Sequence, residues 1–212
     1  MDDVPNNGEK KSYLVPVEKY LEVGVHIGTK IKTGDSARFI FKRRADGIYI
    51  IDIDKIDERI RLAANLLKNY DLKDVLIVAT RIYASNAALK MKKLLGDVDV
   101  ITRRFIPGTL TNPELTHFRE PKIMIVCDPR GEKEALREAG MVNIPVIGLL
   151  DTDNTAYNID LAVPINNKGR KSLAMFFWLI TRELMLSQGK IKSYDEFKVP
   201  LTYFERLELE EE

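Results

Sequence analysis

The sequence of 212 residues contains only one cysteine, two histidines and one tryptophan. A lone cysteine cannot form an internal disulfide and indicates a reducing compartment. Cys127, His26 and His117 do not have the spacing of zinc ligands, and no hydrolase signature is present. The longest apolar run, 173–180, is too short to span a bilayer, and the polar N-terminus is unlike a secretory signal. We therefore expect a cytoplasmic protein with no membrane anchor and no metal site.

Charge is nearly balanced overall, at +1, but it is unevenly distributed. Residues 1–9 hold three acids and no base, and residues 201–212 hold five acids and one base. Between these ends, residues 10–200 contain 32 basic and 24 acidic residues. A basic body is suited to a polyanionic partner such as RNA. A lysine-rich solvated surface explains the same composition equally well, so composition alone leaves both interpretations open.

Short apolar runs alternate with helical patterns along most of the chain. Apolar strands of this kind predict a mostly parallel sheet with helices on both faces, because a sheet with one wet face shows polar alternation. The predicted strands are 75–79, 98–101, 123–127, 146–150 and 161–165. The predicted helices are 16–23, 56–70, 83–95, 131–139 and 171–187.

Turn and cap residues mark the limits of these elements. Asp46-Gly47 between apolar runs predicts an N-terminal hairpin. We expect Asp54 to cap the helix after the hairpin and Gly140 to end the helix 131–139. The organisation predicted from these patterns is a flexible tail over 1–12, one α/β domain over 13–190, and a C-terminal extension over 191–212 with an acidic end.

Basic residues gather in three loop regions. Residues 30–44 have a net charge of +5, with Asp35 as the single acid. Two arginines precede a loop rich in glycine, threonine and asparagine, which suits contacts with sugars and phosphates. Cations at the start of the last helix oppose the helix dipole, which favours a bound phosphate there. The predicted RNA-binding residues are Lys30, Lys32, Arg38, Lys42, Arg43, Arg44, Arg103, Arg104, Thr109, Thr111, Asn112, Lys168, Arg170 and Lys171.

Aspartates at the ends of predicted strands support a different hypothesis. Asp52, Asp128 and Asp151 could hold Mg²⁺ in a phosphotransfer or receiver-like site. Helix caps and turns use aspartate just as routinely. The glycine-rich phosphate loops that such chemistry needs are absent. The residues therefore favour a non-enzymatic binding protein, either for RNA or for another protein.

Six segments resemble a known family in their order along the chain. They are 20–28 (YLEVGVHIG), 45–52 (ADGIYIID), 104–112 (RFIPGTLTN), 128–130 (DPR), 143–152 (NIPVIGLLDT) and 159–166 (IDLAVPIN). Together they resemble the "S-two" family of small-ribosomal-subunit proteins, in the archaeal and eukaryotic branch that includes the laminin-receptor precursor. Bacterial members carry a long helical hairpin after the GTLTN loop. Here only 113–121 follows that loop, and the chain stops at Glu212, which favours the archaeal form.

The resemblance implies a three-layer, flavodoxin-like α/β domain without an enzyme site. It implies a structural constituent of the small ribosomal subunit that binds rRNA and neighbouring ribosomal proteins during assembly and translation. No cofactor, small-molecule substrate or membrane partner is implied. A family member should be basic where it meets rRNA, which agrees with the basic loops, and the acidic ends should then face solvent or a basic protein.

Overall fold

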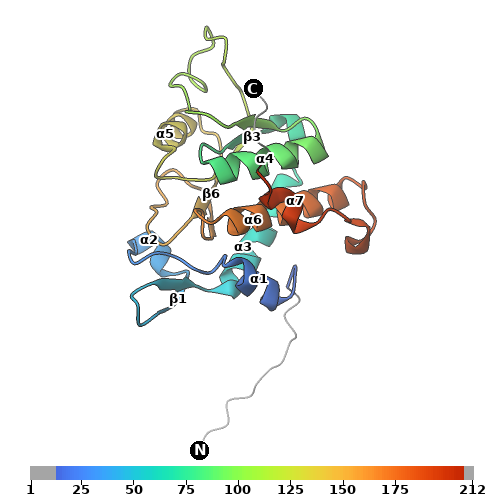
Figure 1. Cartoon of the computed structure of the whole chain (residues 1–212). Helices are drawn as coiled ribbons and strands as arrows, with labels where there is room; N and C mark the ends of the chain where they lie inside the picture. The colour runs from blue at the N-terminus through green and yellow to red at the C-terminus, as the bar shows by residue number, and fades with distance from the viewer. Residues whose placement is uncertain (1–12, 208–212) are drawn as a thin grey trace, which may run out of the picture.

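The computed structural model of the chain describes residues 13–207. The predictions of a flexible tail over 1–12 and of an acidic end over 208–212 lie outside these residues. The described part has three layers, with helices on both sides of a central sheet and a hairpin near the N-terminus (Figure 1). This confirms the predicted fold class. Within the described residues, no helix combines the length and apolar character that a membrane span requires.

The central sheet has five strands, all parallel, in the order β4-β3-β5-β6-β7. Numbered by their own sequence order, these strands follow the flavodoxin-like arrangement 2-1-3-4-5. Strands β3, β5 and β6 are buried along their whole length, as their unbroken apolar sequences predict. The strands are β3 (Val75–Val78), β4 (Asp99–Ile101), β5 (Ile123–Val126), β6 (Val146–Leu150) and β7 (Leu161–Pro164).

Two apolar cores lie between the sheet and the elements that cover its faces. The larger core packs most of the helices against one face, and the smaller packs α5 and the loop 102–122 against the other. In the larger core, Phe176 and Phe177 are fully buried and meet edge to face. The helices are α1 (Val17–Val23), α3 (Ile53–Leu67), α4 (Ile82–Leu95), α5 (Lys133–Met141), α6 (Arg170–Ser187) and α7 (Leu201–Glu205), with 3₁₀ turns at Leu72–Asp74 and Tyr194–Glu196.

The predicted N-terminal hairpin is confirmed as the antiparallel pair β1 (Ile40–Arg43) and β2 (Tyr49–Ile51). Gly47 lies in its turn at φ +89°, a conformation that favours glycine. The cap prediction was wrong by two residues. Asp52 caps α3 by accepting from the Asp54 backbone N–H, and Asp54 lies in the first turn.

The predicted end of the helix at Gly140 was also wrong, because α5 continues to Met141. The left-handed residue after this helix is Asn143, at φ 56°. Gly140 serves close packing instead. A Cβ there would lie 2.5 Å from the Asn158 side-chain nitrogen, which donates to the Leu136 carbonyl oxygen. Helix α5 is thereby held against the loop that follows β6.

The hairpin region is joined to the carboxyl edge of the sheet by hydrogen bonds to the loop after β6. Thr33 donates its backbone N–H to the Thr152 carbonyl oxygen, and the hydroxyl of Ser36, in the short helix α2 (Gly34–Ala37), donates to that same oxygen. Gly28 permits this approach, because a Cβ there would lie 2.4 Å from the Thr152 methyl carbon. The hairpin therefore sits at the edge of the sheet where α/β folds place their binding groups.

Candidate nucleic-acid interface

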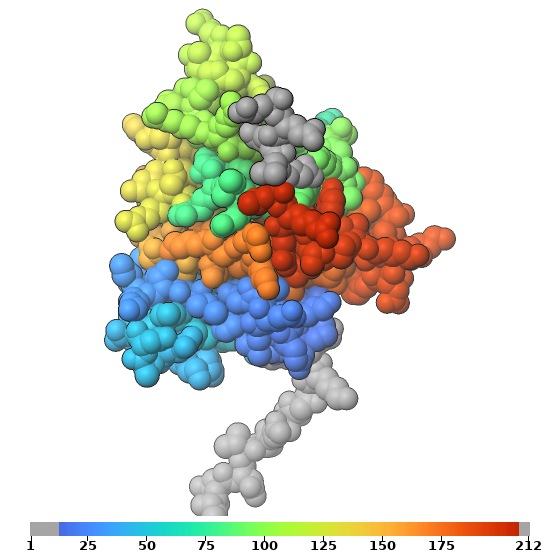
Figure 2. All heavy atoms as spheres, in the orientation of Figure 1, coloured from blue at the N-terminus to red at the C-terminus, as the bar shows by residue number. Residues whose placement is uncertain are grey.

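The six basic residues within 30–44 are all exposed. They lie in the loop before α2, directly after α2, and on or directly after β1, at the end of the molecule that is coloured blue to cyan in Figure 2. Few internal contacts engage them. Arg44 pairs with Asp46 at 3.1 Å in an exposed position, and Arg43 donates to the Gly47 carbonyl oxygen. Their charges are therefore open to an external anion.

Aromatic rings lie between these cations. Lys32 and Arg43 both approach the Tyr49 ring, at 5.6 and 5.4 Å from its centroid. Phe41 is 67% exposed, with the Lys42 ammonium 5.7 Å from its ring. Cations beside exposed rings can bind phosphate and stack on a base with the same surface. We call residues 30–49 the basic hairpin.

The three predicted cations at the start of α6 differ in their contacts. Lys168 is engaged inside the protein, because its ammonium is 2.8 Å from both Asp153 carboxylate oxygens and 3.3 Å from Asp151. Arg170 and Lys171 are exposed in the first turn of the helix. Lys168 of this cluster contacts the loop 151–156, as do Thr33 and Ser36 of the basic hairpin, so this loop connects the start of α6 to the hairpin.

The loop with Arg103 and Arg104 lies at the opposite end of the molecule from the basic hairpin (Figures 1 and 2). Both arginines are exposed, as are Thr111 and Asn112. Thr109 is only 3% exposed, and its hydroxyl donates to the Ile106 carbonyl oxygen. The exposed members of the fourteen predicted residues therefore lie at two separate ends of the molecule, whereas Thr109 is buried and Lys168 is paired internally.

Glu138 of α5 holds this loop in place. Its buried carboxylate accepts from the backbone N–H groups of Gly108 and Leu110 and from the Thr111 hydroxyl. Gly108 lies at φ +91°, where glycine is favoured. The loop N–H groups that suit a phosphate are therefore already paired with an internal carboxylate.

The aspartates of the enzyme hypothesis also have internal partners. Asp128 is 2.7 Å from the Arg81 guanidinium, Asp151 pairs with Lys168, and Asp52 caps α3. Burial raises the pKa of the Asp151 carboxyl, and the Lys168 charge opposes that rise. Among residues 13–207, no group of three or more His, Cys, Asp and Glu side chains could hold a metal ion.

Flavodoxin-like folds bind ligands where the strand order reverses, here between the carboxyl ends of β3 and β5. Glu132 occupies this position and is 2% exposed. Its carboxylate accepts from the Thr80 backbone N–H and hydroxyl and from the backbone N–H groups of Cys127 and Asp128, at 2.8–3.0 Å. Burial raises the Glu132 pKa to about 7, although these hydrogen bonds lower it. An internal carboxylate thus takes the donors that a bound phosphate would use.

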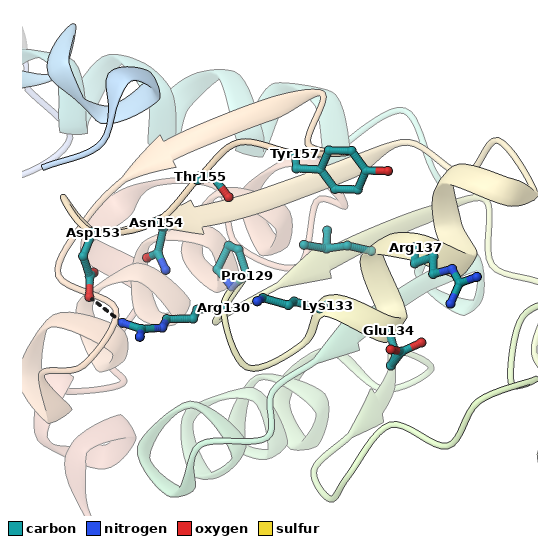
Figure 3. Close-up of a pocket in the computed structure, with 10 residues that line it drawn as sticks. Pro129, Arg130, Lys133, Glu134, Arg137, Asp153, Asn154, Thr155 and Tyr157 are labelled. Atoms are coloured by element: carbon teal, nitrogen blue, oxygen red, sulfur yellow. Dashed lines mark ion pairs between the residues drawn. The ribbon is translucent and has the colours of Figure 1, made fainter.

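Sequence reasoning missed a set of residues around α5. Arg130, Lys133, Arg137 and Tyr157 line a hollow of about 470 Å³ (Figure 3). Acidic residues alternate with the basic ones in this segment, so no basic cluster is visible in the sequence. The alternation of charges at helical spacing was the available signal, because it leaves Lys133 and Arg137 one turn apart on the same face.

Comparison with known proteins gives consistent matches. A family model described as Ribosomal protein S2 matches residues 20–117 and 115–185. The small ribosomal subunit protein uS2 of Thermoplasma volcanium is 43% identical over 196 residues, which cover 92% of this chain and 98% of that protein. The small ribosomal subunit protein uS2 of Methanococcus maripaludis is 44% identical over 192 residues, covering 88% of this chain and 87% of that protein.

Proposed function

The chain belongs to the ribosomal protein S2 family, and from this premise we propose that it binds small-subunit rRNA through the basic hairpin and the adjoining start of α6. As a family member it is a structural component of the small ribosomal subunit rather than an enzyme. Recognition of that family from six ordered segments is confirmed. The RNA contacts and the neighbouring ribosomal proteins belong to the proposal.

The observation that carries the proposal is the exposure of all six cations of residues 30–44 beside aromatic rings. Folded RNA is recognised through its shape, phosphates and 2′-hydroxyls and by stacking of unpaired bases. Exposed cations with few internal partners supply phosphate contacts, and Phe41 and Tyr49 supply rings. Arg170 and Lys171 extend this surface. Arg103, Arg104, Thr111 and Asn112 form a second surface at the other end, and an RNA or a neighbouring protein would contact them separately.

Charge reversal in the basic hairpin tests this assignment. In cells expressing the Arg43→Glu, Arg44→Glu variant, we expect less of the protein to sediment with small subunits on a sucrose gradient. We also expect the incorporated fraction to leave at lower salt than the parent protein. The loss of affinity should be on the order of ten-fold or more, because phosphate contacts carry most of the salt-dependent binding.

The matched control reverses two exposed lysines elsewhere, Lys92→Glu with Lys198→Glu. This pair changes net charge equally but leaves the basic hairpin intact, so it should sediment like the parent. Equal losses in both variants would show a general charge effect and would contradict the assignment. Unchanged incorporation of the Arg43→Glu, Arg44→Glu variant would contradict it directly.

A further inference from the structure

The hollow beside α5 has an apolar floor and polar sides. Pro129 and Leu136 are buried at its base. Figure 3 shows Lys133, Glu134 and Arg137 along the helix, with Thr155 and Tyr157 on the loop opposite. Its volume of about 470 Å³ is within the range of roughly 300–1,000 Å³ that is typical of ligand sites. We call this hollow the α5 pocket.

Tyr157 is the aromatic side chain of the α5 pocket. It is 69% exposed and, among the described residues, has no hydrogen-bond or ring partner. Both of its neighbours are anchored. The Ala156 N–H donates to the Asp35 carboxylate at 2.8 Å, and the Asn158 side chain donates to the Leu136 carbonyl oxygen. The loop therefore presents the Tyr157 ring to solvent from an anchored stretch of backbone, beside the apolar floor.

The charges around the α5 pocket favour an anion. Lys133 and Arg137 are exposed and have no ion pair among the described residues. Asp153 is neutralised by Lys168 at 2.8 Å and by Arg130 at 3.7 Å. Glu134 is then the one lining carboxylate without an ion pair in the part of the chain that the structure describes.

We propose that the α5 pocket binds a single unstacked nucleotide of the small-subunit rRNA. The base stacks on Tyr157 over Pro129 and Leu136, and Lys133 and Arg137 bind the flanking phosphates. Aromatic rings beside cations are the common means of binding unpaired RNA bases. This inference rests on the proposed function, because it needs the RNA to be in place.

The position of the α5 pocket supports this choice of ligand. The Thr33 hydroxyl of the basic hairpin region donates to the carbonyl oxygen of Asn154, which lines the pocket. The Asp35 contact with Ala156 joins the same two regions. One RNA segment that lies on the basic hairpin can therefore continue into the α5 pocket without leaving the protein surface.

Tyrosine substitutions test the stacking contact. With small subunits carrying the full chain, we expect Tyr157→Ala to weaken retention at raised salt on the order of ten-fold, from the strength of base–aromatic stacking. Tyr157→Phe should retain binding, because the ring remains. Tyr83→Ala removes an exposed tyrosine from α4, outside the pocket, and should change nothing. Equal retention of Tyr157→Ala and the parent would overturn the proposal.

Removing acidic or basic side chains from the α5 pocket should change retention in small subunits in opposite directions. Glu134→Gln should strengthen retention, since it removes the unpaired carboxylate. Lys133→Ala with Arg137→Ala should weaken retention and reduce the dependence of log affinity on log salt by about one for each cation. A salt dependence that stays unchanged in the double variant would contradict the assignment of phosphate contacts to the α5 pocket.

Photochemical cross-linking identifies the occupant directly. Ultraviolet irradiation of intact small subunits, followed by nuclease and protease digestion, should yield a nucleotide adduct on the peptide that contains Tyr157. An adduct between this peptide and another protein would overturn the proposal in favour of a protein neighbour. If the Arg43→Glu, Arg44→Glu variant weakens binding but Tyr157→Ala does not, the proposed function stands and the α5 pocket assignment fails. If neither weakens binding, both fail.

Discussion

Acidic side chains at the carboxyl edge of the sheet are turned inward, whereas the basic side chains of the hairpin beside them are turned outward. Glu132, Asp128 and Asp151 are buried, and each has hydrogen-bond or ion-pair partners inside the protein. The cations within 30–44 are exposed, and their internal contacts are few. The carboxylates that suggest an enzyme therefore stabilise the fold, while the cations stay available to a partner.

Glu132 occupies the position where this fold usually binds a ligand. Open α/β sheets bind anionic ligands through backbone N–H groups at the point where strand order reverses. Here the carboxylate of the same chain accepts from those donors. We propose that binding occurs instead at the basic hairpin and in the α5 pocket, away from the point where the strand order reverses.

Removing the Glu132 carboxylate should have the largest effect on stability. Glu132→Ala leaves the N–H groups of Thr80 and Asp128 without an acceptor, whereas the Cys127 N–H keeps the Val78 carbonyl oxygen. At roughly 1–3 kcal/mol for each of these two unpaired groups, we expect a loss of about 3 kcal/mol. Urea unfolding measures it as a lower midpoint with an unchanged slope. Glu134→Ala, in an exposed position on α5, should cost less than about 0.5 kcal/mol. Similar losses in both variants would refute the anchoring role.

The same carboxyl should make stability depend on pH. Its pKa is about 7 in the folded protein, against an ordinary value of 4.5. The folded state therefore binds the proton more tightly, and this contribution is present below pH 4.5 and is lost as the pH rises towards 7. The expected total is about 3 kcal/mol, from about 1.4 kcal/mol per unit of pKa.

Glu132→Gln isolates this contribution, because the amide does not titrate. Burial lowers the pKa of His26, which gives a slope of opposite sign below its ordinary value of 6.5. Both proteins keep His26, so the difference between their unfolding free energies at each pH reports Glu132. A difference that is constant from pH 4.5 to 7 would contradict the prediction.

Glu138 is a second buried carboxylate that accepts from backbone N–H groups, and its removal should have a smaller effect on stability. Glu138→Ala should release the loop 102–122 at a cost of about 2 kcal/mol, because two backbone donors lose a buried acceptor. Hydrogen exchange at the Gly108 and Leu110 amides measures the local opening. Glu114→Ala, an exposed change in the same loop, is the control. Unaltered exchange in Glu138→Ala would show that other contacts hold the loop.

Local patterns predicted the elements well. The five strands, the hairpin and the long helices begin and end within a few residues of the predicted limits, because apolar runs and Asp-Gly turns act over short distances. The polar network could not be predicted in this way. Glu132 resembles any acid before a helix, since its partner Thr80 is 52 positions away in sequence. Thr109 was assigned to the surface, but the loop folds it inward.

The predicted RNA-binding set shows the same limit. Sequence spacing located the exposed cations within 30–44 but gave no sign that Lys168 is paired with Asp151 and Asp153. It also left out Tyr157, which approaches α5 only through the contacts of its neighbours with Asp35 and Leu136. Such contacts depend on how the strands are ordered, and a pattern of apolar runs does not contain that order.

A smaller change in stability than for Glu132→Ala or Glu138→Ala is expected when the outward-turned cations are replaced. Arg43→Glu with Arg44→Glu removes an exposed ion pair, one cation–ring contact and the exposed hydrogen bond from Arg43 to the Gly47 carbonyl oxygen. Exposed contacts of either kind contribute little, so the free energy of unfolding should fall by less than about 1 kcal/mol. Urea unfolding of the isolated protein measures this change. A loss as large as that of Glu132→Ala would show that the basic hairpin stabilises the fold. Near-parent stability, together with loss from small subunits, would mean that the two sets of charges are divided between folding and binding.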